Sequence, residues 1–376
     1  MAADVPLFPG ACAGFDDTPL RPGSGRILVA ADPADAFARW LSEAASLAHE
    51  RPVAGERFVF VNAWNDWGQG AHLEPDQRLG HALLRAAASA LAPYEVRAER
   101  ASSEPAPATP AADQPQSASA ACVTVIHAFY PDLLERLLDG LDLAAPLYVT
   151  VPPEGEAAVR EILGRLAPTA QVRVYENRGR DVRPFLLLLP ELQAEGFSVV
   201  LKLHTKRSPH HAGRGADWLA QLSAPLSRLQ REGGLLPAFA EHDDLGMLGA
   251  AGHVLDGATY AGVAGNRAWI RRLCRHLDLP DLPADYGYVA GTMFAARLTL
   301  FAPLVGRSEV LEWFEPDMGL TDGTLAHAFE RLFGGLAALA GQTIGTVGEG
   351  EGGRLELVPQ AQPLRRAYAF APRDGD

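Results

Sequence analysis

Residues 174–209 read VYENRGRDVRPFLLLLPELQAEGFSVVLKLHTKRSP, and the architecture expected for the chain follows from the pattern of this segment. Two apolar, strand-like runs each end in a group of polar and charged residues, and a helix predicted over 184–195 lies between them. A strand, a helix and a second strand in this order are typical of a parallel sheet with right-handed crossovers. Open α/β sheets bind ligands at the carboxyl ends of their strands, so the two polar groups are predicted to lie side by side there.

The chain is predicted to have three parts. Residues 1–97 show a short β-α-β-α pattern. Residues 98–120 are rich in alanine, proline and serine, which predicts a disordered linker, because such a segment cannot bury enough apolar surface to order itself. Residues 121–372 alternate strands and helices, which predicts a mainly parallel sheet covered by helices on both faces.

The elements are predicted from apolar periodicity and turn residues. In the first part they are strands at 26–31 and 57–61, the second of them buried, a helix capped by Asp32 or Asp35 and ending near His49, and a helix at 77–91. In the third part the strands are 123–127, 146–151, 171–175, 198–203, 245–250 and 287–296. The helices there are 131–141, 154–166, 184–195, 218–232, 266–277 and 321–339, with an irregular tail from about 345.

Composition excludes several classes of protein. The chain has 376 residues and a net charge of −13, which argues against a nucleic-acid partner, because such a partner needs a basic face. Cys12, Cys122 and Cys274 are too widely spaced for a metal or disulfide framework, and buried free thiols are expected. With no signal-peptide pattern and no apolar run of ~18 residues, a soluble cytoplasmic protein is expected. Peripheral association with a membrane surface stays open.

Residues 61–76, VNAWNDWGQGAHLEPD, resemble the C-terminal part of the barrel domain of WbsX-like proteins, related to endo-mannosidase-type glycoside hydrolases. FPGACAGFDDTP at 8–19 is a weaker match. The resemblance implies a small, partial α/β barrel fragment. The family has two carboxylates where this chain has Asp66 and Gln69, and glutamine cannot titrate, so hydrolysis is disfavoured. Trp64, Trp67 and His72 remain candidates for lining a sugar site.

Five segments of the third part resemble the rhamnan synthesis protein F family, bacterial glycosyltransferases of cell-surface polysaccharide assembly. They are HAFYPDLLERLL, ENRGRDVRPFL, LKLHTKRSPH, YVAGTMFAAR and DGTLAHAFERLFG, and they occur in this order over about 121–370. The resemblance implies a GT-A-like (Rossmann-like) α/β domain. It also implies transfer of a deoxyhexose, typically rhamnose, from a nucleotide diphosphate to a growing O-antigen, capsule or rhamnan chain.

A transferase of this kind must stabilise the negative charge of a diphosphate as the sugar bond breaks. Many GT-A enzymes use a metal held by Asp-x-Asp after strand four, where this chain reads His204-Thr205-Lys206. A metal-independent site is therefore expected, in which cations replace the metal. No cofactor is expected, and dTDP-rhamnose is a candidate donor. The predicted donor-binding residues are His127, Asn177, Arg178, Arg180, Asp181, His204, Thr205, Lys206 and Arg207.

Some of these assignments have structural alternatives. Asp181 has the residue type and position either to accept a hydrogen bond from a ligand hydroxyl or to cap the helix that follows it. Lys202, inside the strand, is a candidate for pairing with a carboxylate within the sheet. Arg178 and Arg183 are candidates for binding phosphate or for pairing with Asp181 and Glu176.

An inverting transferase also needs a base that deprotonates the acceptor hydroxyl. Asp322, at the head of the helix predicted over 321–339, is the first choice, and Glu330 is the second. The alternative for Asp322 is a helix N-cap, and His327 is read either as a further polar group or as a packed or capping histidine. Gly291, Thr292 and Met293 are predicted to line the acceptor side, where a glycan or lipid-linked glycan binds, and the alternative for this segment is an ordinary core strand.

A second hypothesis comes from a different class of function. It is a non-catalytic module that binds a glycan or nucleotide sugar within a polysaccharide assembly complex, and binding of nucleotide sugar without turnover would favour it. Peripheral association with the inner membrane face or with other glycosyltransferases stays open under both hypotheses.

Overall fold

The structure is a computed structural model that describes residues 7–21, 23–28, 32–94, 121–207, 215–260, 264–316, 320 and 322–365. The predicted linker at 98–120 and the pair His210-His211 lie outside these ranges. The chain forms two compact units. Unit 1 comprises 1–108, 261–276 and 317–328, and unit 2 comprises 109–260, 277–316 and 329–376.

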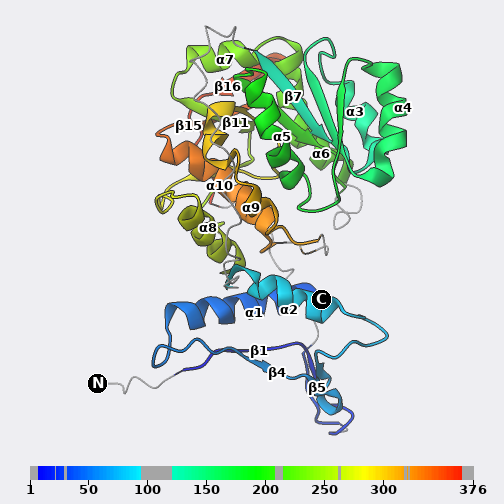
Figure 1. Cartoon of the computed structure of the whole chain (residues 1–376), viewed down its shortest axis with the longest axis vertical. Coiled ribbons are helices and arrows are strands. Elements are labelled where there is room, and N and C mark those ends of the chain that lie inside the picture. Colours follow the sequence, from blue (N-terminus) through cyan, green and yellow to red (C-terminus); the bar gives the residue numbers. More distant parts are fainter. Residues whose placement is uncertain are drawn as a thin grey trace, which may run out of the picture. The chain divides into compact units, whose positions relative to one another are not determined.

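Unit 2 is built on one eight-stranded sheet with the order β16-β15-β11-β14-β10-β7-β8-β9. Figure 1 labels β16, β15, β11 and β7 of this sheet. The strands of the sheet are β7 (Cys122–His127), β8 (Leu147–Val151), β9 (Gln171–Val174), β10 (Val199–His204), β11 (Leu245–Ala250), β14 (Phe294–Arg297), β15 (Thr343–Glu349) and β16 (Leu355–Val358). Strands β9, β8, β7 and β10 are parallel, and β11 is parallel to β15. Only β14 and β16 run antiparallel to their neighbours, so the predicted mainly parallel sheet is confirmed.

Helices cover both faces of this sheet. Successive residues of a strand point to opposite faces, so Leu201 and Lys202 of β10 mark the two sides. Leu201 lies in a large aliphatic core, which is filled from α3 (Leu134–Leu138), α4 (Glu156–Leu166), α6 (Gly215–Arg231) and α7 (Leu235–Glu241). On the side of Lys202, an aromatic cluster is formed by Phe294 of β14 with Phe185, Phe301 and Phe333. These three come from α5 (Val182–Ala194), η5 (Leu298–Leu304) and α10 (Leu325–Leu339), respectively.

Four predicted elements of the third part differ in the structure. The helix predicted over 131–141 is a 3-10 turn, η3 (Pro131–Leu133), followed by α3, which ends at Leu138. The strand predicted over 287–296 is two strands, β13 (Gly287–Val289) and β14, and β13 pairs with β12 (Val254–Asp256) in a separate sheet. The chain turns between them because Gly291 and Thr292 have left-handed φ values of 81° and 52°. The tail is not irregular, since it forms β15, η6 (Glu351–Gly353) and β16. Helix α10 begins at Leu325 rather than at 321.

Unit 1 is a small layer of helices and short strands. Its helices are α1 (Pro33–Glu50), α2 (Ala82–Leu91) and α8 (Ala264–His276), and Asp32 caps α1 by accepting a hydrogen bond from the backbone N–H of Asp35 at 3.0 Å. Its strands are paired as β1 (Gly10–Cys12) with β4 (Phe60–Asn62), in parallel, and as the hairpins β2 (Phe15–Asp16) with β3 (Ile27–Leu28) and β5 (Asn65–Asp66) with β6 (Ala71–His72).

The strand predicted over 57–61 is present as β4, but it is not buried. Phe58 and Phe60 are 52% and 61% exposed, and their rings meet that of Phe8. The buried core of unit 1 instead lies among α1 and α2, around Phe37, Leu41 and Leu83. Within the described ranges, no helix is both long enough and apolar enough to cross a bilayer.

Candidate functional site

A buried ion pair between Lys202 and Asp181 is the centre of the candidate site. Lys202 is 1% exposed on β10, and its ammonium donates to Oδ2 of Asp181 and, at 3.0 Å, to the carbonyl of Thr292. The rings of Phe185 and Phe294 flank the ammonium, each with its centroid 5.7 Å away. The predicted alternative for Lys202, pairing with a carboxylate within the sheet, is therefore confirmed.

The backbone of the loop that follows β9 places the Asp181 side chain next to Lys202. Gly179 and Arg180 both have left-handed φ values, 68° and 55°. A Cβ on Gly179 would lie 2.5 Å from the ring of Phe314, so only glycine fits at this position. Asp181 then occupies the N-cap position of α5, but its side chain makes no capping hydrogen bond. Helix capping by the Asp181 carboxylate is therefore a wrong prediction, and the carboxylate contacts the sheet instead.

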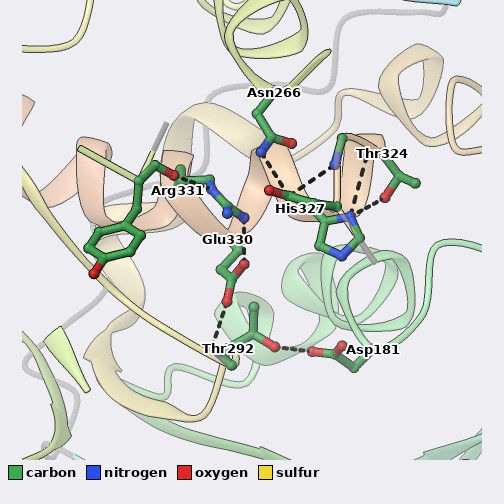
Figure 2. Close-up of polar contacts among 11 residues, drawn as sticks. Asp181, Asn266, Thr292, Thr324, His327, Glu330 and Arg331 are labelled. Carbon is green, nitrogen blue, oxygen red and sulfur yellow. Dashed lines mark hydrogen bonds and ion pairs between the residues drawn. The ribbon is translucent and has the colours of Figure 1, made fainter. Parts of the chain in front are cut away.

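Two hydrogen bonds hold the turn at Gly291-Thr292 in place, one to Asp181 of the same centre and one to Glu330 of α10 (Figure 2). The hydroxyl of Thr292 donates to Oδ2 of Asp181 at 2.5 Å, and the backbone N–H of Gly291 donates to Oε1 of Glu330 at 2.5 Å. A positive φ on a β-branched residue costs on the order of 1–3 kcal/mol, which these contacts and the Lys202 bond offset. The structure thus brings together Asp181, Lys202, Thr292 and Glu330.

The other predicted acceptor residue, Met293, is fully buried and packs in the aliphatic core of unit 2. Glu330 is also engaged by a second partner, because its Oε2 accepts a hydrogen bond from Nη1 of Arg331 at 2.7 Å. Both carboxylate oxygens of Glu330 therefore have partners within the fold.

Two buried histidines, one from each of two paired strands, adjoin the ion pair. His127 on β7 and His204 on β10 are partners in the strand register. Nδ1 of His127 lies 2.9 Å from the hydroxyl of Thr150, and Nδ1 of His204 lies 3.4 Å from Oδ2 of Asp181. Burial lowers the pKa of His127 to about 4 and that of His204 to about 3, against the opposite effect of Asp181. Both imidazoles are therefore neutral at pH 7.

The pKa of Asp181 moves in the direction that keeps it ionised. Burial by itself raises this pKa, but the interactions with His204 and Lys202 and the hydrogen bond from Thr292 outweigh burial. The net result is a pKa well below the ordinary value of an aspartate. At pH 7 the centre therefore holds one carboxylate, one ammonium and two neutral imidazoles.

Lowering the pH from 7 to 5 is expected to destabilise unit 2. An unfolded histidine titrates near pH ~6.5, so below that pH the unfolded chain binds protons that His127 and His204 do not take up in the folded state. Each of these histidines then lowers the free energy of unfolding by about 2 kcal/mol at pH 5. The contribution of Asp181 persists at pH 5, because it is lost only as the pH falls through and below ~3.9, the unfolded value.

Urea unfolding followed by circular dichroism at the two pH values measures this loss. In a His127→Gln variant, which keeps a polar partner for Thr150 but cannot titrate, the loss between pH 7 and pH 5 is expected to be about 2 kcal/mol smaller. The same pH dependence in the variant and the natural chain would contradict this assignment of the pKa.

The predicted donor-binding residues after β10 lie next to the end of β7. Thr205 accepts a hydrogen bond from the backbone N–H of Tyr130 at 2.8 Å, which joins the two strand ends. Arg207 pairs with Asp132 at 2.5 Å and lies over the ring of Tyr130. The ammonium of Lys206, which is half-buried, is 6.0 Å from the ring centroid of Trp218. Two cations, Lys206 and Arg207, therefore lie at this edge of the sheet, two and three residues after His204 of the buried centre.

Arg178 and Arg183, in the loop after β9 and the start of α5, stabilise the fold by donating to backbone carbonyls. Arg178 donates from Nη2 to the carbonyl of Glu312 at 2.8 Å and from Nε to that of Phe314, and Arg183 donates to that of Leu311 at 3.1 Å. The predicted alternative, in which these arginines pair with Asp181 and Glu176, is wrong. Asn177 is exposed and Arg180 is half-buried at the turn.

Asp322, the first choice for the catalytic base, belongs to unit 1. Oδ1 of Asp322 accepts hydrogen bonds from Nδ2 of Asn266 at 2.8 Å and from the backbone N–H of Gly323 at 2.9 Å. His327 caps the start of α10, since its Nδ1 lies 2.8 Å from the hydroxyl of Thr324 and accepts from that residue's backbone N–H (Figure 2). The capping alternative for His327 is therefore confirmed.

No three His, Cys, Asp or Glu side chains are grouped to hold a metal ion anywhere in the described ranges. The three cysteines form no disulfide within the described residues. Cys274 is buried as expected, whereas Cys12 and Cys122 are partly exposed, so the expectation of buried thiols is wrong for those two.

Comparison with known proteins gives two family matches. Residues 108–341 match the family described as rhamnan synthesis protein F, and residues 1–87 match the family described as glycosyltransferase WbsX. Both resemblances found in the sequence are therefore confirmed, and the WbsX match lies at the N-terminus of the chain.

Two relatives are similar along almost the whole chain. Both bear the name WxcX, both are described as uncharacterized, and they come from two strains of Xanthomonas campestris pv. campestris, B100 among them. Each is 33% identical over 367 residues, which cover 97% of this chain but 50% of the relative. The chain thus spans about half the length of these curated relatives. No solved structure matches it.

Proposed function

Because the chain belongs to the rhamnan synthesis protein F family, we propose that it is a glycosyltransferase that adds a sugar, most simply rhamnose, to a growing cell-surface polysaccharide. The donor is a nucleotide-diphosphate sugar such as dTDP-rhamnose, and the reaction inverts the anomeric centre without a bound metal. The protein works on the cytoplasmic side, where a glycan or lipid-linked glycan is the acceptor.

The buried Lys202–Asp181 pair is the observation that carries this proposal. Burying two charges is costly, and apolar residues of similar size often stabilise a fold as well or better. The three contacts given above all reach Oδ2 of Asp181, which leaves Oδ1 as the candidate acceptor for a ribose or donor-sugar hydroxyl. We assign this role to Oδ1, because the pair lies near the carboxyl ends of β7 and β10, where open α/β sheets bind ligands.

The same sheet supports a GT-A-like arrangement of the donor site. The segment His204-Thr205-Lys206 follows β10, which is the fourth of the strands along unit 2 and pairs with β7, the first. In the proposed site, Lys206, Arg180 and Arg207 neutralise the diphosphate, Asn177 contributes an amide, and His127 and His204 act as neutral hydrogen-bonding groups. Arg178 contributes indirectly by fixing the segment that contains Glu312.

Asp322 is the proposed base, with Glu330 as the second candidate. Glu330 accepts hydrogen bonds at both carboxylate oxygens, one of them from the cation of Arg331. Both oxygens of Glu330 are thus already engaged within the fold, which makes this carboxylate the second choice. Gly291 and Thr292, which contact Glu330 and Asp181, are proposed to border the acceptor.

Transfer is tested by incubating the full chain with a panel of nucleotide sugars and a rhamnan oligosaccharide, and by measuring the free nucleoside diphosphate and the extended glycan. We expect both products with a dTDP-sugar, at equal rates with and without a chelator. Activity that collapses with chelator and returns with manganese would contradict the metal-independent site. Tight binding of the nucleotide sugar with no turnover on any acceptor would support a binding module instead.

Replacing Lys206 with alanine is expected to lower the transfer rate about 10²–10³-fold, because one group that stabilises charge in the transition state is lost. The fold should persist, since this side chain is only half-buried and lies at a strand end. Steady-state rates and circular dichroism measure the two effects. Arg136→Ala is the matched control, because it also removes one cation from unit 2, and its rate should not change. Full activity of the Lys206 variant would remove this lysine from the site.

A further inference from the structure

Two exposed indoles in unit 1 are held by a single carboxylate. Trp64 and Trp67 are 54% and 51% exposed, although tryptophan is a residue that folds usually cover. Glu74 accepts a hydrogen bond from the indole N–H of Trp64 at 3.1 Å through Oε1, and from that of Trp67 at 2.7 Å through Oε2. The backbone N–H of Glu74 also donates to the carbonyl of Trp64 at 3.0 Å.

Trp67 is also held by His72, which in turn pairs with Asp76. The ring of His72 stacks on this indole with a centroid distance of 3.8 Å and an interplanar angle of 18°. Nε2 of His72 lies 3.0 Å from Oδ2 of Asp76, and Asp76 in turn accepts from the backbone N–H of Arg78 at 2.7 Å. One face of the Trp67 indole is therefore covered by His72, while about half of the residue remains exposed.

We propose that Trp64, Trp67 and Glu74 form a binding site for a neutral glycan that this protein holds without cleaving. A pyranose ring has a flat apolar face of C–H groups and an edge of hydroxyl groups. The indoles can pack against the apolar C–H face of the sugar. The carboxylates of Glu74 and Asp66 can accept hydrogen bonds from its hydroxyl groups. Since aromatic side chains fixed in advance lose little entropy on binding, the bonds to Glu74 favour affinity.

The chemistry of the surrounding side chains selects the class of ligand. Asp66 lies between the two indoles in the sequence and Glu74 accepts from both of them, and these two carboxylates repel a phosphate or an acidic sugar. Gln69, three residues after Asp66, cannot titrate, so the pair of carboxyl groups that hydrolysis requires is incomplete here. Binding without hydrolysis follows, and it does not depend on the transferase proposal for unit 2.

The test titrates the full chain with a neutral rhamnose oligosaccharide and with a mannose oligosaccharide, in the absence of any nucleotide sugar. Calorimetry and indole fluorescence report binding. Trp67→Ala and Trp64→Ala should each weaken affinity at least tenfold, and Glu74→Gln should weaken it less. Trp67→Phe keeps a ring but loses the bond to Glu74, so an intermediate affinity is expected.

Trp40 provides the matched control, because it is 44% exposed on α1 of the same unit. Trp40→Ala should bind both oligosaccharides as the natural chain does, with an unchanged circular dichroism spectrum. Binding that is equal in Trp67→Ala and the natural chain, or no binding of either probe at millimolar concentration, would overturn the proposal. So would self-association that disappears in the Trp64 and Trp67 variants while both sugar titrations stay flat, since the indoles would then form a protein interface.

Discussion

Replacing Lys202 with methionine is expected to lower the free energy of unfolding by about 3–5 kcal/mol, enough to unfold a marginally stable domain. Methionine fills a similar volume between Phe185 and Phe294, so packing is largely kept. What remains is the carboxylate of Asp181, buried and without its cation, next to a Thr292 carbonyl that has lost its donor. Urea unfolding followed by circular dichroism measures the effect.

The double variant Lys202→Met with Asp181→Asn is the control that isolates the charge. It removes both members of the ion pair and keeps an acceptor for the Thr292 hydroxyl, so it should be more stable than Lys202→Met alone. Transfer should be lost in the double variant, because asparagine has one oxygen and the Thr292 hydroxyl already uses it. Transfer should fall in Lys202→Met as well, because the Asp181 carboxylate loses the ammonium that positions it. A double variant no more stable than Lys202→Met would show that the cost comes from packing rather than from an unpaired charge.

Replacing Asp322 with asparagine is expected to lower the transfer rate about 10²–10⁴-fold, the usual contribution of a positioned general base. Asparagine keeps an oxygen that can accept from Asn266 and from the backbone N–H of Gly323, so the local fold should survive. The rise of the transfer rate with pH that reflects deprotonation of the base should disappear as well. This change would not occur if Asp322 had only a structural role. Rates across pH 5–9 with saturating donor would measure both effects.

Glu330→Gln is the matched variant, because glutamine still offers an oxygen to the backbone N–H of Gly291. We expect it to retain most of the transfer rate. A large loss in Glu330→Gln together with little loss in Asp322→Asn would exchange the two roles and make Glu330 the base. Full activity in both would remove both from the chemistry.

The sheet of unit 2 was predictable because its strands are short apolar runs separated by helices of clear periodicity. Strands β7, β8, β9, β10 and β11 lie within a residue or two of the predicted ranges. The pattern failed at GYVAGTMFAA, where apolar residues continue through a left-handed turn. The glycine inside that strand-like run was the available signal, since such a glycine often marks a bend or close approach.

The site was predictable only in part. Charged residues at strand ends indicated Asp181, His204 and Lys206, and pairing of Lys202 within the sheet was a stated alternative. The bond from Thr292 to Asp181 and that from Gly291 to Glu330 join residues more than thirty positions apart, so no local pattern reveals them. Burial of Met293 agrees with the alternative for its segment, a core strand, rather than with a place on the acceptor side.

The three-segment make-up of unit 1 has a consequence for how the chain is made on the ribosome. Helix α8 supplies ion pairs to Glu43 and Glu50 of α1, and its Arg272 donates to the carbonyl of Ala92 at 2.7 Å. These partners are translated early, whereas α8 is translated only after most of the sheet strands of unit 2. At ~5–20 residues per second, the nascent N-terminal segment waits on the order of 10 s for α8. During that interval the face of α1 that α8 later contacts is open to chaperones, so holdase dependence during synthesis is the expected phenotype of this topology.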